Sequence, residues 1–135
     1  MKLINSKMHG ILDYVLVFML SIAPFIFNLD EESIHCRLLM VTGLLLLLVS
    51  LLTDFEFFLV KVFSFKVHLI LDIALGIFLA ISPLLFDLSG NSIVPHIVLG
   101  LAIIGTSAIT KTSKEPAKVE EMQEDLQNDM ITQES

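Results

Sequence analysis

The chain has 135 residues, of which 55% are hydrophobic and 17% are charged, with a formal net charge of −7. A soluble domain of this length would carry about a quarter charged residues, so the composition excludes an ordinary soluble domain. Seven of the fifteen acidic residues lie from Glu115 onward, which places the negative charge largely in a tail and argues against a nucleic-acid partner. A single cysteine, Cys36, excludes an internal disulfide.

Four apolar segments follow one another, at about residues 9–27, 34–52, 67–86 and 93–109. Each is close to the roughly 20 residues with which a helix crosses a hydrocarbon core of about 30 Å. None has the polar stripe of a surface helix. Because Asp13 interrupts the first segment, we expect a permanent helix there and not a cleaved signal peptide. The sequence therefore predicts an all-α integral membrane protein with four transmembrane helices.

The motif K-x-H-x-I-L-D occurs twice, 59 residues apart, and opens the first and third segments. Nearly half of residues 7–34 are identical to their counterparts in residues 66–93, and after a two-residue slip the match continues to Thr53 and Thr110. This duplication predicts two tandem helical hairpins in a four-helix bundle, with pseudo-two-fold symmetry along the membrane normal. The predicted division is residues 7–54 and 66–112 for the hairpins, 55–65 for an interfacial cytoplasmic loop, and 113–135 for an acidic cytoplasmic tail.

Basic residues are distributed unequally between the two sides of the predicted bundle. The side that holds both ends and the middle loop carries seven of the eight, namely Lys2, Lys7, Lys61, Lys66, Lys111, Lys114 and Lys118. Only Arg37 lies on the opposite side. The positive-inside rule therefore predicts a bacterial inner-membrane protein with both termini in the cytoplasm.

The first and third segments end in related stretches, Ser21-Ile22-Ala23-Pro24-Phe25-Ile26-Phe27 and Ala80-Ile81-Ser82-Pro83-Leu84-Leu85-Phe86. With the doubled His-x-x-Leu-Asp, the segment Leu52 to Glu56 and the pair Pro95-His96, this pattern over roughly residues 7–112 resembles the SPW-repeat family of small bacterial membrane proteins. The family's Ser-Pro-Trp reads Ala23-Pro24-Phe25 and Ser82-Pro83-Leu84 here, so Trp is replaced in both repeats. The resemblance implies a four-span architecture and supplies no reaction and no catalytic residues.

Local signals mark the predicted helix boundaries. The two prolines should end or kink their helices near the outer interface. The polar turns that follow offer side chains to cap the next helices, namely Asp30, Ser33, Ser89 and Ser92. Three glycines should permit close helix approach, namely Gly43, Gly100 and Gly105.

Ionisable residues open the first and third helices, where an apolar environment tolerates them poorly. His9 and Asp13 are four apart, as are His68 and Asp72, so each pair shares one helix face. An ionised Asp costs about 2.5–3.5 kcal/mol at mid-bilayer and less near the boundary, which favours a partner. The candidate polar cluster therefore comprises His9, Asp13, His68 and Asp72, helped by Lys7 and Lys66.

Three interpretations of this cluster remain open. It could be a polar clamp that locks the first and third helices, a metal site with two His and two Asp ligands, or a proton relay at the mouth of a permeation path. We favour the clamp and assign no catalytic, cofactor-binding or metal-binding residue. His35, Cys36 and His96 are interpreted as residues near the outer interface without such a role.

The sequence contains no phosphate loop, H-E-x-x-H, C-x-x-C or nucleophile elbow. We therefore expect no enzyme and no cofactor, and a structural or interaction role in the membrane. The alternative is a small proton- or cation-handling transporter or channel component that uses the cluster. The expected partner is the lipid bilayer, with a second copy of the chain or another membrane protein as open alternatives.

Overall fold

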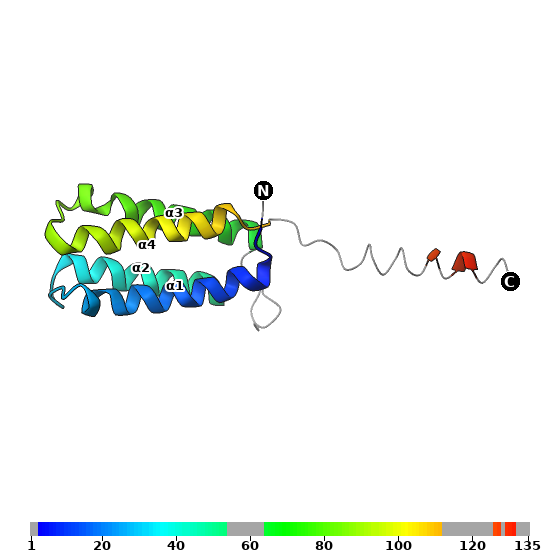
Figure 1. The fold of residues 1–135 in the computed structure, drawn as a ribbon, viewed down its shortest axis with the longest axis horizontal. Helices are drawn as coiled ribbons and strands as arrows, with labels where there is room; N and C mark the ends of the chain where they lie inside the picture. Colours follow the sequence, from blue (N-terminus) through cyan, green and yellow to red (C-terminus); the bar gives the residue numbers. More distant parts are fainter. Residues whose placement is uncertain (1–2, 54–63, 112–125, 128, 132–135) are drawn as a thin grey trace.

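Four long helices form one elongated bundle in the computed structural model, which describes residues 3–53, 64–111, 126–127 and 129–131 (Figure 1). They are α1 (Ser6–Ile26), α2 (Ile34–Leu51), α3 (Phe65–Leu85) and α4 (Ile93–Ala108), with a short 3-10 helix η1 (Gly90–Ser92) before α4. Each of the four spans is long and apolar enough to cross a membrane. The predicted all-α, four-span membrane fold is confirmed. Most of the predicted cytoplasmic loop and tail lies outside the described residues.

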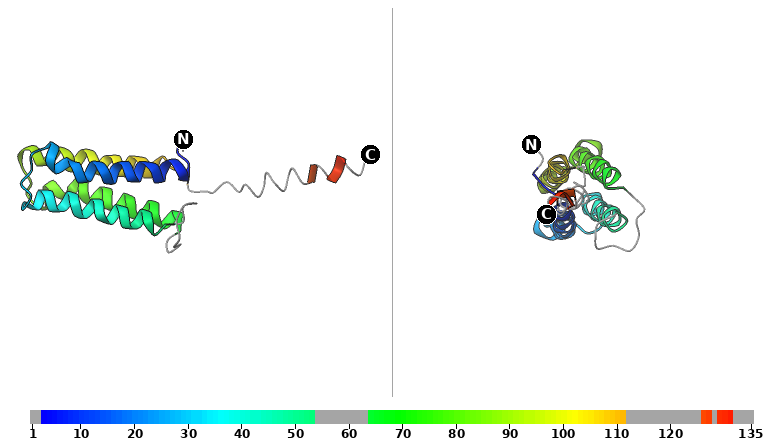
Figure 2. Two further views of the ribbon diagram at one scale, coloured as in Figure 1. Left: turned by 90° about the horizontal axis from the view of Figure 1, so that it is seen from below. Right: turned by 90° about the vertical axis from the view of Figure 1, so that its right-hand side faces the viewer.

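The helices stand at the four corners of the bundle when it is seen end-on (Figure 2). The first helix, α1, packs against α2 and α4, and α3 packs against the same two, so α1 and α3 face each other across the diagonal. Main-chain hydrogen bonds join the residues just before α1 to the residues just after α4. The amide of Leu3 donates to the carbonyl of Ile109 at 2.8 Å, and the amide of Lys111 donates to the carbonyl of Ile4 at 2.8 Å. The starts of α1 and α3 therefore share one end of the bundle with the end of α4.

Side chains cap three of the helix starts. Asn5, Ser33 and Ser64 each accept a hydrogen bond from an amide in the first turn of the helix that follows. The cap predicted at Ser33 is thus confirmed. Ser92 occupies the corresponding position before α4, but its backbone is already helical after η1 and its hydroxyl donates to the carbonyl of Ser89 at 2.7 Å instead. Its predicted capping role is wrong for that reason.

The prolines lie in the last turns of α1 and α3, two residues before each helix ends. The chain then turns through a residue in the left-handed region, Asn28 at φ 51° or Asp87 at φ 50°. The next amide donates back to the proline carbonyl, at 2.8 Å for Pro24 and 2.9 Å for Pro83. Asn and Asp tolerate this conformation better than most residues, so the two turns close in the same way.

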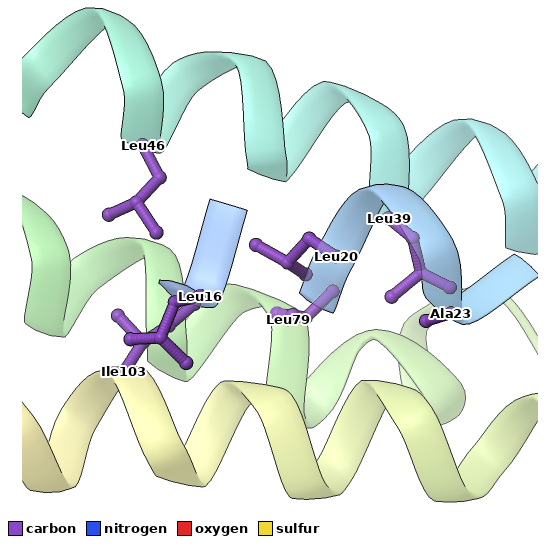
Figure 3. Packing of buried hydrophobic residues seen from close by; sticks show 7 residues of the cluster. All are labelled: Leu16, Leu20, Ala23, Leu39, Leu46, Leu79 and Ile103. Carbon is purple, nitrogen blue, oxygen red and sulfur yellow. The ribbon is translucent and has the colours of Figure 1, made fainter. Parts of the chain in front are cut away.

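The middle of the bundle is filled by apolar side chains from all four helices (Figure 3). This core consists of Leu16, Leu20, Ala23, Leu39, Leu46, Leu79 and Ile103. Large apolar side chains also cover the outside, for example Phe18, Leu44, Ile70 and Leu101. An apolar exterior around an apolar core is the arrangement that hydrocarbon, and not water, stabilises.

Close approach of α3 and α4 depends on two glycines. A Cβ at Gly100 would lie 2.7 Å from the amide nitrogen of Ala80 and 2.7 Å from the carbonyl oxygen of Gly76. Gly43 is also tight, because a Cβ there would lie 3.2 Å from the Cβ of Leu20. No neighbouring atom lies within 4 Å of a Cβ at Gly105, so the predicted close contact at that glycine is wrong.

We expect Gly100→Ala to destabilise the protein by about 1–3 kcal/mol, because the new methyl group meets rigid backbone atoms. The matched control is Gly105→Ala, which has free space around its Cβ and gains helix propensity of up to about 1 kcal/mol. Unfolding of both purified variants in detergent, followed by circular dichroism, measures the difference. Equal stability of the two variants would contradict the close approach of α3 and α4.

Candidate functional site

Four buried side chains meet at the end of the bundle where α1 and α3 begin. They are His9 and Asp13 from α1 and His68 and Asp72 from α3, here called the His/Asp cluster. All four are at most 1% exposed, and their ligand atoms lie within 4.8 Å of one another. Residues four apart share a helix face, so each helix directs its pair toward the bundle axis. The two copies of the duplicated motif therefore form one site.

Short contacts join the imidazoles to the carboxylates. Nε2 of His68 lies 2.9 Å from Oδ2 of Asp13, and Nε2 of His9 lies 3.1 Å from Oδ2 of Asp72. Within the helices, Nε2 of His68 is 3.0 Å from Oδ2 of Asp72, and Nε2 of His9 is 3.5 Å from Oδ1 of Asp13. The two Nε2 atoms are 3.2 Å apart. Both rings and both carboxylates thus converge on one small volume.

Threonine hydroxyls fix the other nitrogen of each ring. Oγ1 of Thr53 lies 3.0 Å from Nδ1 of His68, and Oγ1 of Thr110 lies 3.0 Å from Nδ1 of His9. Each hydroxyl donates its single proton to the carbonyl oxygen four residues earlier, at 2.6 Å. In the contact with the ring, Nδ1–H must therefore be the donor. Both histidines carry a proton at Nδ1 and direct Nε2 toward the carboxylates.

Serine hydroxyls orient the carboxylates. Ser50 of α2 donates to Oδ2 of Asp13 at 3.0 Å, and Ser107 of α4 donates to Oδ2 of Asp72 at 3.3 Å. The other oxygen of Asp72, Oδ1, is buried and has no hydrogen-bond partner in the part of the chain that the structure describes. The polar contacts thus draw on all four helices and occur in two matching sets, one for each copy of the motif.

An aromatic ring covers the cluster at the end of the bundle. Phe65, the first residue of α3, is 7% exposed and packs edge-on against His9, with ring centroids 5.8 Å apart. The same ring stacks on His68 at 6.0 Å. Phe65 therefore limits the access of water to the two imidazoles.

The predicted site residues divide into two groups. His9, Asp13, His68 and Asp72 come together as the repeat suggested, whereas Lys7 and Lys66 are exposed and lie outside the buried group. The buried cluster is consequently smaller than the predicted one. The two histidines and two aspartates can neutralise one another's charges or hold a cation, while both lysine side chains remain exposed.

The repeat-motif residues lie at the opposite end of the bundle from the cluster. Pro24, Ser82 and Pro83 are buried, and the Ser82 hydroxyl donates to the carbonyl of Leu79 at 2.7 Å. Phe25 and Leu84, which replace the tryptophans of the motif, are 68% and 87% exposed. Their outward position suits contact with lipid.

Two further residues near that end are more buried than an interfacial position requires. His96 is 0% exposed, and its Nδ1 lies 2.6 Å from the carbonyl oxygen of Ser92. Cys36 is also buried, while His35 is half-buried. Among the described residues, the His/Asp cluster is the only group of three or more His, Cys, Asp or Glu side chains whose ligand atoms lie close enough together to hold a metal ion.

Five residues of the site were not predicted from the sequence, namely Phe65, Ser50, Thr53, Ser107 and Thr110. The signal for the hydroxyls was present, because the two Ser-x-x-Thr pairs occupy matching places at the ends of α2 and α4. Residues three apart on a helix share a face, so each pair can reach one His and one Asp.

Comparison with protein families gives one match. Residues 7–110 match the family model described as the SPW repeat domain, which confirms the resemblance drawn from the sequence. No curated protein and no solved structure matches the chain. The match covers all four helices and the whole His/Asp cluster.

Proposed function

Since the chain belongs to the SPW repeat family, we propose that it is a non-enzymatic structural or interaction protein of the bacterial inner membrane, in which the His/Asp cluster fastens two helical hairpins together. The observation that carries this proposal is the contact of α1 with α3 through the cluster. These two helices lie across the diagonal of the bundle, and their facing His and Asp side chains meet at 2.9–3.2 Å. A hydrogen bond between membrane helices is worth about 0.6 kcal/mol on average and up to about 1.7 kcal/mol. Several such bonds in one buried place can therefore set the register of the two hairpins.

The proposed orientation places the cluster at the cytoplasmic end of the bundle. Support comes from the lysines, because Lys7, Lys66 and Lys111 lie at this end and Arg37 lies at the other. Proteolysis of a C-terminal tag in inside-out but not in right-side-out membrane vesicles is the expected result. Cleavage only in right-side-out vesicles would reverse the orientation.

Proton or cation handling is the second candidate function, favoured by the burial of four ionisable side chains in one place. The described interior beyond the cluster argues against a path through a single bundle. Leu20, Leu39, Leu46 and Leu79 are each 0% exposed there, and Ile103 is 1% exposed. Buried polar residues do lie beyond the cluster, namely Thr42, Ser82 and His96. Along their helices Leu46, Leu79 and Ile103 separate them from it, so an apolar layer interrupts any chain of polar groups that a hydrated ion or a proton could follow.

A flux assay separates the two functions. We expect proteoliposomes that contain the protein to conduct protons and monovalent cations no faster than empty liposomes. The comparison variant carries Asp13→Asn and Asp72→Asn, and its helix content is checked by circular dichroism. Flux in the wild type that disappears in a folded double variant would replace the fastening role with transport.

A further inference from the structure

Three ligand atoms of the His/Asp cluster have the spacing of the ligands around a tetrahedral metal ion. The two Nε2 atoms and Oδ2 of Asp72 form a nearly equilateral triangle with sides of 3.2, 3.1 and 3.0 Å. A tetrahedral ion with bonds of about 2.0 Å holds its ligand atoms about 3.3 Å apart. Asp13 is the candidate for the fourth ligand, because its Oδ2 lies 2.9 Å from Nε2 of His68 and its Oδ1 lies 3.5 Å from Nε2 of His9. One ligand atom from each of the four residues lies within 4.8 Å of the others, so Asp13 has to move closer to complete a tetrahedron.

The protonation of the rings makes Nε2 available to a cation. Both Nδ1 atoms donate to threonine hydroxyls, so Nε2 is the atom with a lone pair in each neutral ring. Two lone pairs at 3.2 Å, next to two carboxylates, repel one another unless positive charge lies between them. Two fully protonated rings would instead bring two positive N–H groups together at the same short distance. One added proton shared between the rings and the carboxylates relieves the repulsion and leaves the cluster with a net charge of −1, whereas a single divalent ion relieves it and neutralises both carboxylates.

The surrounding groups are those that orient metal ligands. A metal-bound histidine usually donates its second N–H to an oxygen, which Thr53 and Thr110 provide. Ligating carboxylates are themselves hydrogen-bonded, which Ser50 and Ser107 provide. The buried Oδ1 of Asp72 has no hydrogen-bond partner among the described residues, although a buried carboxylate oxygen normally has one. This oxygen is therefore a hydrogen-bond acceptor that no described donor uses, and it lies beside the ligand atoms of the site.

We infer that the His/Asp cluster binds one divalent transition-metal ion, for which Zn²⁺ is the best fit. Imidazole nitrogen suits Zn²⁺ better than Mg²⁺ or Ca²⁺, and four protein ligands satisfy a tetrahedral ion completely. With no position left for water or substrate, the site is structural. This inference rests on the proposed function, because the ion would be the element that fastens α1 to α3.

The position of the cluster lets an ion reach it without crossing the apolar core. His9 lies in the first turn of α1 and His68 in the first turn of α3, at the end where both helices begin. Phe65 covers the rings there as a single side chain. Among the described residues, Phe65 is the side chain that packs on both imidazole rings from this end, so an ion from the adjacent aqueous side would reach the cluster past that ring without crossing the apolar core.

Metal binding to the full-length protein in detergent tests this inference. The protein is stripped with a chelator and then titrated with Zn²⁺ by calorimetry, and the bound metal is counted by elemental analysis. We expect one Zn²⁺ per chain, with binding lost in His68→Gln and in Asp72→Asn. His96→Gln is the matched control, because His96 is equally buried but lies at the other end of the bundle, and it should bind as the wild type does.

A second readout needs no variant and so does not depend on how the variants fold. Wild-type protein loaded with Co²⁺ should show the intense visible absorption of a tetrahedral site, and Zn²⁺ should displace it. A folded, stripped wild type that binds no Zn²⁺, or a weak six-coordinate Co²⁺ spectrum, overturns the inference. If metal binding fails while loss of the carboxylates still lowers stability, the fastening role stands without an ion. If both fail, the proposed function fails as well.

Discussion

Asp72→Asn is expected to lower the melting temperature of the purified protein by at least about 10 °C. The carboxylate oxygen Oδ2 receives contacts from His9, His68 and Ser107 at once, and all three residues are buried. An amide cannot supply the same negative charge, and removing one partner of a buried charged group costs about 3–5 kcal/mol. In a bundle of this size about 3 kcal/mol corresponds to a shift of more than 10 °C.

Two comparisons make this result specific. Asp13→Asn should have a smaller effect, because its closest contacts are with His68 and Ser50 while His9 lies 3.5 Å away. Asp87→Asn is the matched control, since it makes the same chemical change on an exposed turn. Asn28 holds the same left-handed conformation in the other hairpin, so Asn should be tolerated there. A melting temperature of Asp72→Asn equal to that of Asp87→Asn would remove the cluster from any stabilising role.

The duplication explains how the centre of the site could be predicted. A His and an Asp four apart must share a helix face, and a repeated hairpin must bring two such faces to the same membrane depth. His9 and Asp13 therefore meet His68 and Asp72 in the structure as expected. The apolar length of each segment likewise predicts four spans, because a helix satisfies all of its backbone hydrogen bonds within the bilayer and each segment is long enough to cross it.

Other parts depend on packing that the repeat does not encode. The sequence places Phe65 at the end of the predicted interfacial loop, residues 55–65. In the structure it is instead the first residue of α3 and packs on His9. The two lysines next to the histidines point away from the axis because a helix turns about 100° at each residue, and a position two residues from His9 or His68 faces outward. Gly100 and Gly105 look alike in the sequence, but a Cβ at Gly100 would meet the backbone of α3, whereas a Cβ at Gly105 would meet no described neighbouring atom within 4 Å.

The hydrogen bonds that the two histidine Nδ1–H groups donate to threonine are the feature of the site with the largest expected effect on metal affinity. In the double variant Thr53→Val, Thr110→Val we expect Zn²⁺ to bind about 100-fold more weakly or worse, since one such outer contact is worth about 10–100-fold. Valine keeps the shape of threonine but leaves each Nδ1–H buried without an acceptor. Each ring then loses the bond that fixes both its proton and its orientation. Calorimetric titration of the stripped full-length variant measures the change.

Thr106→Val is the control that isolates orientation from the loss of a hydroxyl. Thr106 lies one turn before Thr110, and its hydroxyl donates to the carbonyl of Ile103 at 2.9 Å. Removing that hydroxyl leaves the hydrogen bond between Thr110 and His9 in place. Changes outside such a hydrogen-bond network have small effects, so the Zn²⁺ affinity should stay within a factor of about three of the wild type. Equal affinity in the double variant and the wild type would show that Nδ1 does not need threonine. The protons would then not be held at Nδ1, and the reason for Nε2 to face a metal ion would disappear with them.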